Sequence, residues 1–365
     1  MILSIAFIAI IGIQIIFISL LFFSFLKKQK STASAAQPPV SVIVCAHDEE
    51  ENIRELVPVL LAQNYSAFEV IIVEDRCNDG TYDYLLQATK ENERLKVVNV
   101  SRKPEHINGK KYALTLGIKA AQYDWVLLTD ADCRPINENW IASMANQMQE
   151  PTKIVIGFSP YFKTKGLLNS FIRFESFLTG LQYVGFALLG KPYMGVGRNL
   201  AYRKNLFLDN KGFNSHLGIT GGDDDLFVNE HATQQNTVVN IGSDALMFSK
   251  PETMWNNFWH QKFRHLSVGK HYKFSDKFLL GIFSLTWMGT WFLLPFTFCS
   301  ELRNVILILF ALRMILLIVS FHIVPKKLGA SFETWKTPFL DFMYAFYYLV
   351  IGAKALFVKN VKWKN

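Results

Sequence analysis

Residues 125–135 read Trp125-Val126-Leu127-Leu128-Thr129-Asp130-Ala131-Asp132-Cys133-Arg134-Pro135, an apolar run followed at once by two carboxylates and a proline. A short apolar run of this kind predicts a buried strand. Side chains alternate across a strand, so Asp130 and Asp132 are expected to point the same way at its end. Pro135 has no N–H for a ladder hydrogen bond and is expected to end the strand.

The two carboxylates have two readings. Like charges on one face repel each other unless a cation lies between them, and hard oxygen ligands suit Mg²⁺ or Mn²⁺. An isolated Asp-x-Asp is also common in an ordinary solvated turn. Other motifs in the sequence are needed to distinguish a cation site from a solvated turn.

Around this stretch the sequence alternates between strand and helix patterns. Strands are expected at 40–46, 68–73, 95–100 and 125–132, and helices at 51–62, after 81 and at 108–121. This alternation predicts a doubly wound, mostly parallel sheet in an α/β fold. Ligands of such sheets bind outside the carboxyl ends of the strands, where Ala46–Asp48, Glu74–Asp75 and Asp130–Asp132 are expected.

No Gly-x-Gly-x-x-Gly and no Gly-x-x-x-x-Gly-Lys-Ser/Thr motif occurs, so neither a dinucleotide-binding fold nor a P-loop is supported. Phosphate would have to be held in another way. A metal on Asp130 and Asp132, together with Lys111, is the expected solution.

The composition indicates membrane segments at both ends of the chain. Of 365 residues 50% are hydrophobic, and the surplus lies in 2–26 and 278–358. The first segment has 25 residues without a charge, enough to cross a hydrocarbon core of about 30 Å. Its start lacks basic residues and Lys27–Lys30 follow it, so we expect an uncleaved anchor with the next domain on the cytoplasmic side of the cell membrane.

The C-terminal part contains three apolar segments. Segments 278–299 and 305–324 are expected to form a membrane hairpin, and 339–358 either spans the membrane or is interfacial or re-entrant. The predicted domains are therefore a transmembrane anchor at 1–27, a catalytic domain at 38–270 and a membrane region at 278–358. Ser31–Pro39 is expected to be a linker.

The net charge indicates the class of binding partner, and the cysteines indicate the redox compartment. The net charge is +8, but the lysines gather at the membrane boundaries, so anionic lipid headgroups are expected as partners rather than nucleic acid. The four cysteines show no CxxC spacing, which favours reduced thiols in the cytoplasm.

The middle of the chain resembles the membrane-bound family 2 glycosyltransferases, which have the GT-A fold. The resemblance covers roughly residues 38–270 and rests on motifs in the right order and spacing. These are Val-Ser-Val-Ile-Val-Cys-Ala-His-Asp-Glu-Glu-Glu-Asn-Ile (40–53), Val-Glu-Asp-Arg-Cys-Asn-Asp-Gly-Thr (73–81), Gly-Lys-Lys-Tyr-Ala-Leu (109–114), Asp-Ala-Asp (130–132), Gly-Gly-Asp-Asp-Asp-Leu (221–226) and Gln-Lys-Phe-Arg-His (261–265). Two positions depart from the family pattern, with Asp48 in place of asparagine and His265 in place of tryptophan.

The resemblance implies a nucleotide-sugar donor, inversion at the anomeric carbon and Mg²⁺ or Mn²⁺ bridging the donor diphosphate and the DXD motif formed by Asp130 and Asp132. It also implies that Gly195–Tyr202 lines the acceptor side. The expected donor-binding residues are Ala46, Asp48, Glu49, Glu74, Asp75, Lys111, Asp130, Gln261 and Arg264.

Three adjacent acids, Asp223, Asp224 and Asp225, are the catalytic candidates. An acid at a helix start can simply be the N-cap, but that role needs only one of the three. Adjacent carboxylates raise one another's pKa, which favours a usable base near neutral pH. The resemblance implies that Asp224 is this base, with Asp223 or Asp225 as its neighbours.

The sequence therefore predicts an inverting, metal-dependent, hexosyltransferase-like enzyme. It would move a sugar from a nucleotide diphosphate to a membrane-associated lipid or glycan acceptor. Two alternatives remain, a processive polysaccharide synthase and a catalytically idle membrane scaffold that retains the fold.

Overall fold

The computed structural model describes residues 1–27, 37–105 and 107–357. The predictions for Lys28–Lys30, for most of the linker and for the basic tail 359–364 lie outside these residues. The described chain divides into two compact units, a helical unit within 1–27, 163–189 and 252–357, and an α/β unit within 37–162 and 190–251.

The α/β unit is built on a seven-stranded sheet with the order β3-β2-β1-β4-β7-β6-β8. Neighbours among β1 to β4 are parallel, whereas β7 is antiparallel to both β4 and β6. The expected mostly parallel sheet is confirmed. Its strands are β1 (Val40–Ala46), β2 (Phe68–Asp75), β3 (Leu95–Val100), β4 (Trp125–Asp130), β6 (Ile154–Ile156), β7 (Leu200–Arg203) and β8 (Thr237–Val239).

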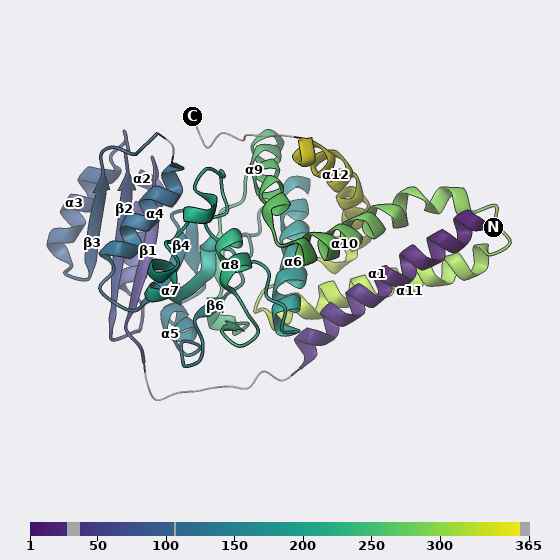
Figure 1. The fold of residues 1–365 in the computed structure, drawn as a ribbon, viewed down its shortest axis with the longest axis horizontal. Helices are drawn as coiled ribbons and strands as arrows, with labels where there is room; N and C mark the ends of the chain where they lie inside the picture. Colours follow the sequence, from purple (N-terminus) through teal and green to yellow (C-terminus); the bar gives the residue numbers. More distant parts are fainter. Residues whose placement is uncertain (28–36, 106, 358–365) are drawn as a thin grey trace. The chain divides into compact units, whose positions relative to one another are not determined.

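Helices pack on both faces of this sheet (Figure 1). On one face α2 (Glu50–Leu61), α3 (Thr81–Glu91) and α5 (Trp140–Ala145) share an apolar core with the strands. On the other face α4 (Gly109–Ala120) comes so close that a Cβ on Gly117 would lie 2.7 Å from a methyl of Val73. Glycine is therefore needed for this close approach.

The carboxyl ends of β1 and β4 meet at the switch point of the sheet. From β1 the chain adds β2 and β3 on one side, then returns to place β4 on the other side of β1. The register pairs Cys45 with Asp130 and Ala46 with Glu74. The edge predicted to carry the ligand site is thus formed by the predicted residues.

The end of β4 differs from the prediction. The strand stops at Asp130, and Pro135 is the last residue of a new strand, β5 (Cys133–Pro135), which pairs antiparallel with β9 (Met247–Ser249). The chain turns at residues 131–132, where the carbonyl of Asp132 accepts a 3.0 Å hydrogen bond from the N–H of Lys250. Strand alternation therefore does not set the orientation of Asp132, and Pro135 does not end β4.

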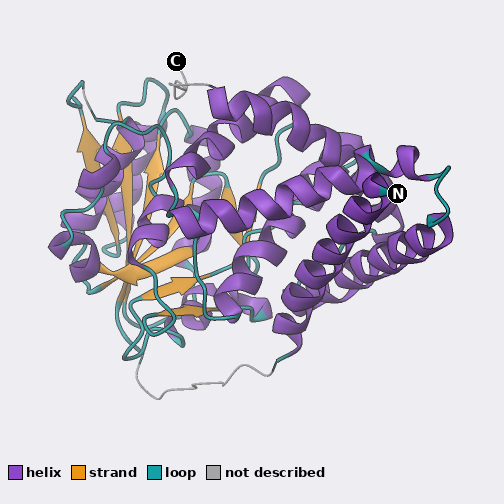
Figure 2. Cartoon of the chain, turned by 45° about the vertical axis from the view of Figure 1, so that its right-hand side comes forward, coloured by secondary structure: helices purple, strands orange, loops and turns teal. Residues whose placement is uncertain are grey.

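Short elements complete the α/β unit, whose strands are drawn in orange in Figure 2. They are η1 (Gly197–Asn199), α7 (Lys204–Asp209), η2 (Asn214–His216), α8 (Asp225–His231) and η3 (Ser243–Ala245).

The helical unit contains α1 (Ile2–Leu26), α6 (Leu167–Leu188), α9 (Trp255–Val268), η4 (Gly269–His271), α10 (Phe274–Phe292), η5 (Leu294–Thr297), α11 (Arg303–Lys327), η6 (Thr334–Lys336) and α12 (Thr337–Phe357). In the described part of the chain, α1 and α11 are long and apolar enough to cross a membrane. They pack side by side (Figure 1). The other two predicted membrane segments form α10 and α12, which do not reach that length and apolarity in the described residues.

Charged groups inside the helical unit are paired. The fully buried guanidinium of Arg313 on α11 donates to the buried carboxylate of Asp341 on α12. The same carboxylate accepts a 2.9 Å hydrogen bond from the indole of Trp291. Pairing offsets the cost of burying charge among apolar helices.

The three predicted domain boundaries remain a prediction. The helical unit includes residues 163–189 and 252–270, which the sequence analysis assigned to the catalytic domain.

Candidate active site

A lysine lies between two of the predicted acids at the switch point. Lys110 Nζ is 3.0 Å from Oδ1 of Asp130 at the end of β4 and 3.3 Å from Oδ2 of Asp223 in the loop before α8. The side chain of Asn108 accepts a 3.2 Å hydrogen bond from the N–H of Lys110 and caps α4. This cap begins the helix where its first turn brings Lys110 to the acids.

The charges of this group stabilise one another. Burial acts to lower the pKa of Lys110, but Asp130 and Asp223 outweigh it and raise the pKa well above its usual value. Burial acts to raise the pKa of Asp223, and the lysine outweighs it, so that pKa is lowered. At neutral pH the group therefore consists of an ammonium between carboxylates.

Lys111 does not fit the donor-binding role predicted for it. Its side chain is fully buried, and Nζ donates to the carbonyls of His216 at 2.5 Å and Ile219 at 2.9 Å. Burial lowers the pKa of Lys111 to about 8. These bonds hold the segment around η2 against α4, and the lysine at the acids is the preceding residue, Lys110.

Helix periodicity could have distinguished the two lysines. Lys111, Leu114 and Ile118 are spaced three and four residues apart and form the buried face of α4. Lys110 lies about 100° away from Lys111 around the helix axis. The resemblance rests on the motif Gly-Lys-Lys as a whole and does not distinguish the buried lysine from the one that faces the acids.

Asp132 is held close to Asp130 by the turn after β4. Its Oδ2 accepts a 3.3 Å hydrogen bond from the hydroxyl of Ser249 on β9. Burial and then the charge of Asp130 raise the pKa of Asp132. The carboxylates of Asp130 and Asp132 fit a divalent cation. A cation that prefers oxygen ligands, such as Mg²⁺ or Mn²⁺, would offset the repulsion between the two negative charges.

The acidic triplet begins after two glycines with left-handed backbone, Gly221 (φ +82°) and Gly222 (φ +78°). Asp224 then caps α8, since its Oδ1 accepts a 2.8 Å hydrogen bond from the N–H of Asp225. Burial and then the charge of Asp223 raise the pKa of Asp224. Asp225 is buried, and its Oδ1 accepts a 2.8 Å hydrogen bond from the next N–H along the chain.

The predicted residues at the ends of β1 and β2 are largely engaged in local structure. Glu74 is buried and accepts hydrogen bonds from the N–H of Cys77 at 2.5 Å and from Asn99 at 2.7 Å. Asp75 pairs with the guanidinium of Arg76 at 2.7 Å. These bonds hold the loop after β2 in place, so the structure shows a local folding role for Glu74 and Asp75. Their donor-binding role stays a prediction.

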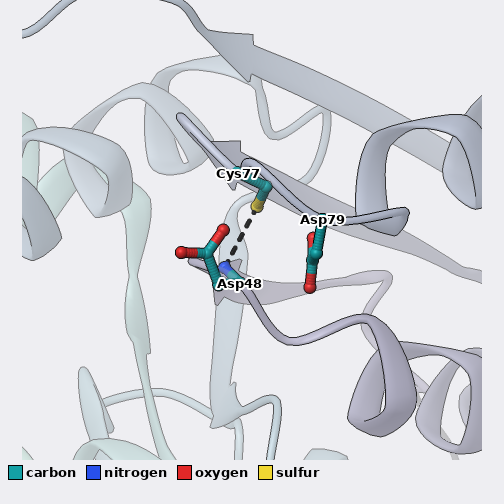
Figure 3. A group of neighbouring side chains, drawn as sticks. All are labelled: Asp48, Cys77 and Asp79. Atoms are coloured by element: carbon teal, nitrogen blue, oxygen red, sulfur yellow. Dashed lines mark hydrogen bonds between the residues drawn. The ribbon is translucent and has the colours of Figure 1, made fainter.

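The loops after β1 and β2 are joined by a second group of possible metal ligands. The side chains of Asp48, Cys77 and Asp79 have ligand atoms that all lie within 4.8 Å of one another (Figure 3). The N–H of Asp48 donates to Cys77 Sγ at 3.4 Å, and Asp79 Oδ2 accepts from the N–H of Glu50 at 3.0 Å. These bonds explain the cluster as a link between two loops.

The two remaining predictions at this edge concern Ala46 and Glu49. The carbonyl of Ala46 accepts a weak 3.5 Å bond from the Cys77 thiol. Glu49 precedes α2 and accepts a 2.7 Å hydrogen bond from the side chain of Asn52. Their donor-binding roles stay predictions.

Gln261 and Arg264 lie on α9 in the helical unit. This helix is fixed to α6 by a buried ion pair of 2.5 Å between Lys262 and Glu175, and by the contact of Phe258 with Phe171. A donor-binding role for Gln261 and Arg264 stays a prediction.

Comparison with known proteins agrees with the fold and the motifs. Residues 41–209 match the sequence model of the family described as Glycosyl transferase family 2. Residues 41–209 are therefore similar to the family 2 glycosyltransferases, and the fold is the GT-A fold expected from the motifs.

Two curated proteins are similar to this chain in sequence. A probable glycosyltransferase of Bacillus subtilis, YdaM, is 27% identical over 243 residues, 62% of this chain and 54% of its own length. The poly-beta-1,6-N-acetyl-D-glucosamine synthase of Staphylococcus aureus is 33% identical over 93 residues, 26% of this chain and 21% of its own length. This chain thus spans about half or less of these curated relatives.

A solved structure with the same fold is the mannosyltransferase PcManGT of Pyrobaculum calidifontis, in complex with GDP-Man and Mn²⁺. It is 16% identical, and the match covers 98% of this chain and 100% of that chain with a TM-score of 0.65. This likeness concerns the fold.

Proposed function

We propose that this chain is an inverting glycosyltransferase that moves a sugar from a nucleotide diphosphate to a membrane-associated lipid or glycan acceptor. The observation that carries the proposal is the Lys110 ammonium between Asp130 and Asp223 at the switch point of the sheet. A cation among acids at this edge suits a ligand that carries phosphate.

In this proposal each side chain has one task. Lys110 donates to oxygens of the donor diphosphate and stabilises the charge that develops as this group leaves. Asp130 and Asp132 would hold Mg²⁺ or Mn²⁺, which would supply further neutralisation of the diphosphate. The mannosyltransferase complex with Mn²⁺ supports this assignment by analogy of fold.

Asp224 is proposed to accept the proton of the attacking hydroxyl. The acceptor oxygen bonds to the anomeric carbon, the bond from that carbon to the diphosphate breaks, and the hydroxyl proton moves to the Asp224 carboxylate. A raised pKa makes a carboxylate a stronger base, and burial beside Asp223 provides it here.

A processive polysaccharide synthase is the second candidate. The similarity to the poly-beta-1,6-N-acetyl-D-glucosamine synthase favours it, because the product of that enzyme is a polymer by name. Product length separates the two candidates, since a single transfer adds one sugar and a processive enzyme gives long chains without short intermediates.

We also propose that the protein is a multi-pass membrane protein with its catalytic domain in the cytoplasm. The apolar helices α1 and α11 support membrane residence, and membrane lipids would then be its partners. Nucleotide sugars are made in the cytoplasm, so the proposed donor requires this orientation.

The test is a screen of nucleotide sugars with purified protein and Mn²⁺, measuring release of the nucleoside diphosphate. We expect turnover with at least one donor and its loss in Lys110→Gln. Lys119→Gln is the matched control, because Lys119 lies on the same helix with an exposed side chain. If the wild-type protein turned over no donor, the proposal would be wrong and the hypothesis of a catalytically idle scaffold would be favoured.

A further inference from the structure

Arg198 is a half-buried arginine beside the DXD acids, within the segment 195–202 for which the family resemblance implies a place on the acceptor side. It lies in η1, which packs against β4, the strand that ends at Asp130, and against β9, the partner of the strand β5 that follows the turn. Its guanidinium lies over the buried ring of Tyr161, with Cζ 4.5 Å from the ring centroid. Stacking on a tyrosine fixes the plane of the guanidinium.

The neighbours of Arg198 in the chain are fixed on both sides. The N–H of Gly197 donates to Oδ2 of Asp224 at 2.6 Å. The fully buried Asn199 donates to the carbonyls of Phe158 at 2.9 Å and Ala245 at 2.7 Å. The backbone that carries Arg198 is therefore held in place before any ligand binds.

The electrostatic surroundings of Arg198 are acidic. Burial acts to lower its pKa, but Tyr161, Cys133 and the carboxylates of Asp132 and Asp130 outweigh burial and raise it. Within the part of the chain that the structure describes, the guanidinium nevertheless makes neither a hydrogen bond nor an ion pair. Its five N–H donors are thus not used by the fold.

We propose that Arg198 is a further donor-binding residue, which donates hydrogen bonds to the diphosphate of the nucleotide sugar beside Asp130 and Asp132. The inference rests on the proposed function. It gives the donor site a second cationic side chain besides Lys110. Guanidinium matches phosphate oxygens with two parallel hydrogen bonds, which an ammonium cannot do. A structural partner for Asp132 would sit within ion-pair distance of it, and Arg198 does not.

The experiment compares nucleoside diphosphates with monophosphates. Binding of UDP, GDP, CDP and ADP, and of UMP, GMP, CMP and AMP, is measured by calorimetry on the full-length protein with Mn²⁺. In Arg198→Gln we expect the affinity for the preferred diphosphate to fall at least tenfold, and that for its monophosphate less than twofold. Arg198→Lys should recover part of the loss, because it keeps the charge and loses the paired geometry.

Arg203→Gln is the matched control. Arg203 also lies over an aromatic ring, with Cζ 4.8 Å from the centroid of Trp125, but it pairs with Glu150 at 2.7 Å and not with the acidic site. This variant should bind both classes of nucleotide as the wild type does.

Three outcomes would overturn the inference. An unchanged diphosphate affinity in Arg198→Gln shows that the residue does not bind the donor, and leaves the proposed function standing. An equal loss for diphosphate and monophosphate, with a lower melting temperature, shows that Arg198 is a structural counter-ion. Absence of binding to every diphosphate in the wild type defeats the proposed function and this inference together.

Discussion

The Oδ2 atom of Asp224 accepts a 2.6 Å hydrogen bond from the backbone N–H of Gly197, so the candidate base is tied to the loop that precedes β7. Its Oδ1 atom is used at the same time to cap α8. The cap and the base are therefore roles of one side chain, and a measurement of chemistry alone does not separate them.

Asp224→Asn should lower sugar transfer by about 10²–10⁴-fold, the usual effect of removing a general base. Asparagine keeps only one of the two acceptor oxygens, so either the cap or the bond from Gly197 is lost, at a cost of about 1–3 kcal/mol of stability. Turnover and melting temperature are measured beside Asp223→Asn and Asp225→Asn. A normal turnover of Asp224→Asn next to an inactive neighbour would move the base to that neighbour, and three active variants would make the triplet structural.

Asp132→Asn should abolish Mn²⁺-dependent donor binding while the fold stays intact. The change removes one of the two carboxylate charges of the proposed cation site, and an amide can still accept the 3.3 Å hydrogen bond from Ser249. Calorimetry of donor binding with and without Mn²⁺ measures this. Unchanged affinity in the variant would contradict the metal assignment.

Lys111→Met should destabilise the protein without a specific effect on donor affinity. The substitution leaves the carbonyls of His216 and Ile219 without their donor in a buried place, at a cost of about 1–3 kcal/mol each. Melting temperature and donor affinity of the folded fraction are compared with those of Lys110→Gln. A stable Lys111→Met protein that has lost donor binding would restore the role first predicted for Lys111.

His216 should make the protein less stable in acid. Burial and then the charge of Lys111 lower the pKa of His216 to about 4 from the model-peptide value of 6.5. Between these two pH values the unfolded chain binds more protons than the folded one, so stability falls as the pH is lowered from 6.5 to 4. Melting temperatures of detergent-solubilised protein over this range should show a shallower fall in His216→Gln. The exposed His260 provides the control substitution, and an equal slope in all three proteins would refute the assignment.

A reporter fused after residue 35 should be active only in its cytoplasmic form. The lysines that follow the N-terminal apolar segment favour this orientation. A signal from the other side of the membrane would overturn the orientation, and with it the access of the domain to nucleotide sugars.

The sequence was sufficient for the elements whose order depends on local pattern. The ends of β1 at Val40–Ala46 and β3 at Leu95–Val100 agree with the predicted residues, because runs rich in valine and isoleucine are bounded by polar turns. The switch point followed from the alternation of strands and helices, and it brought Asp130 next to β1.

Features set by contacts between distant residues could not be predicted in the same way. β4 ends at Asp130 because the chain turns there into β5, which pairs with β9, a strand far away in the sequence. The choice between Lys110 and Lys111 depends on which face of α4 packs inward, and Arg198 became a candidate only when Tyr161 and the DXD acids were found beside it.

The buried ion pair between Arg313 and Asp341 constrains the order in which α11 and α12 can fold during synthesis. Either charge alone inside the apolar helices would cost several kcal/mol, about 3–5 when one partner of a buried pair is removed. During synthesis Arg313 leaves the ribosome 28 residues before Asp341. Helix α12 must therefore be synthesised and packed against α11 before the charge of Arg313 is paired, which makes α11 and α12 a single folding unit.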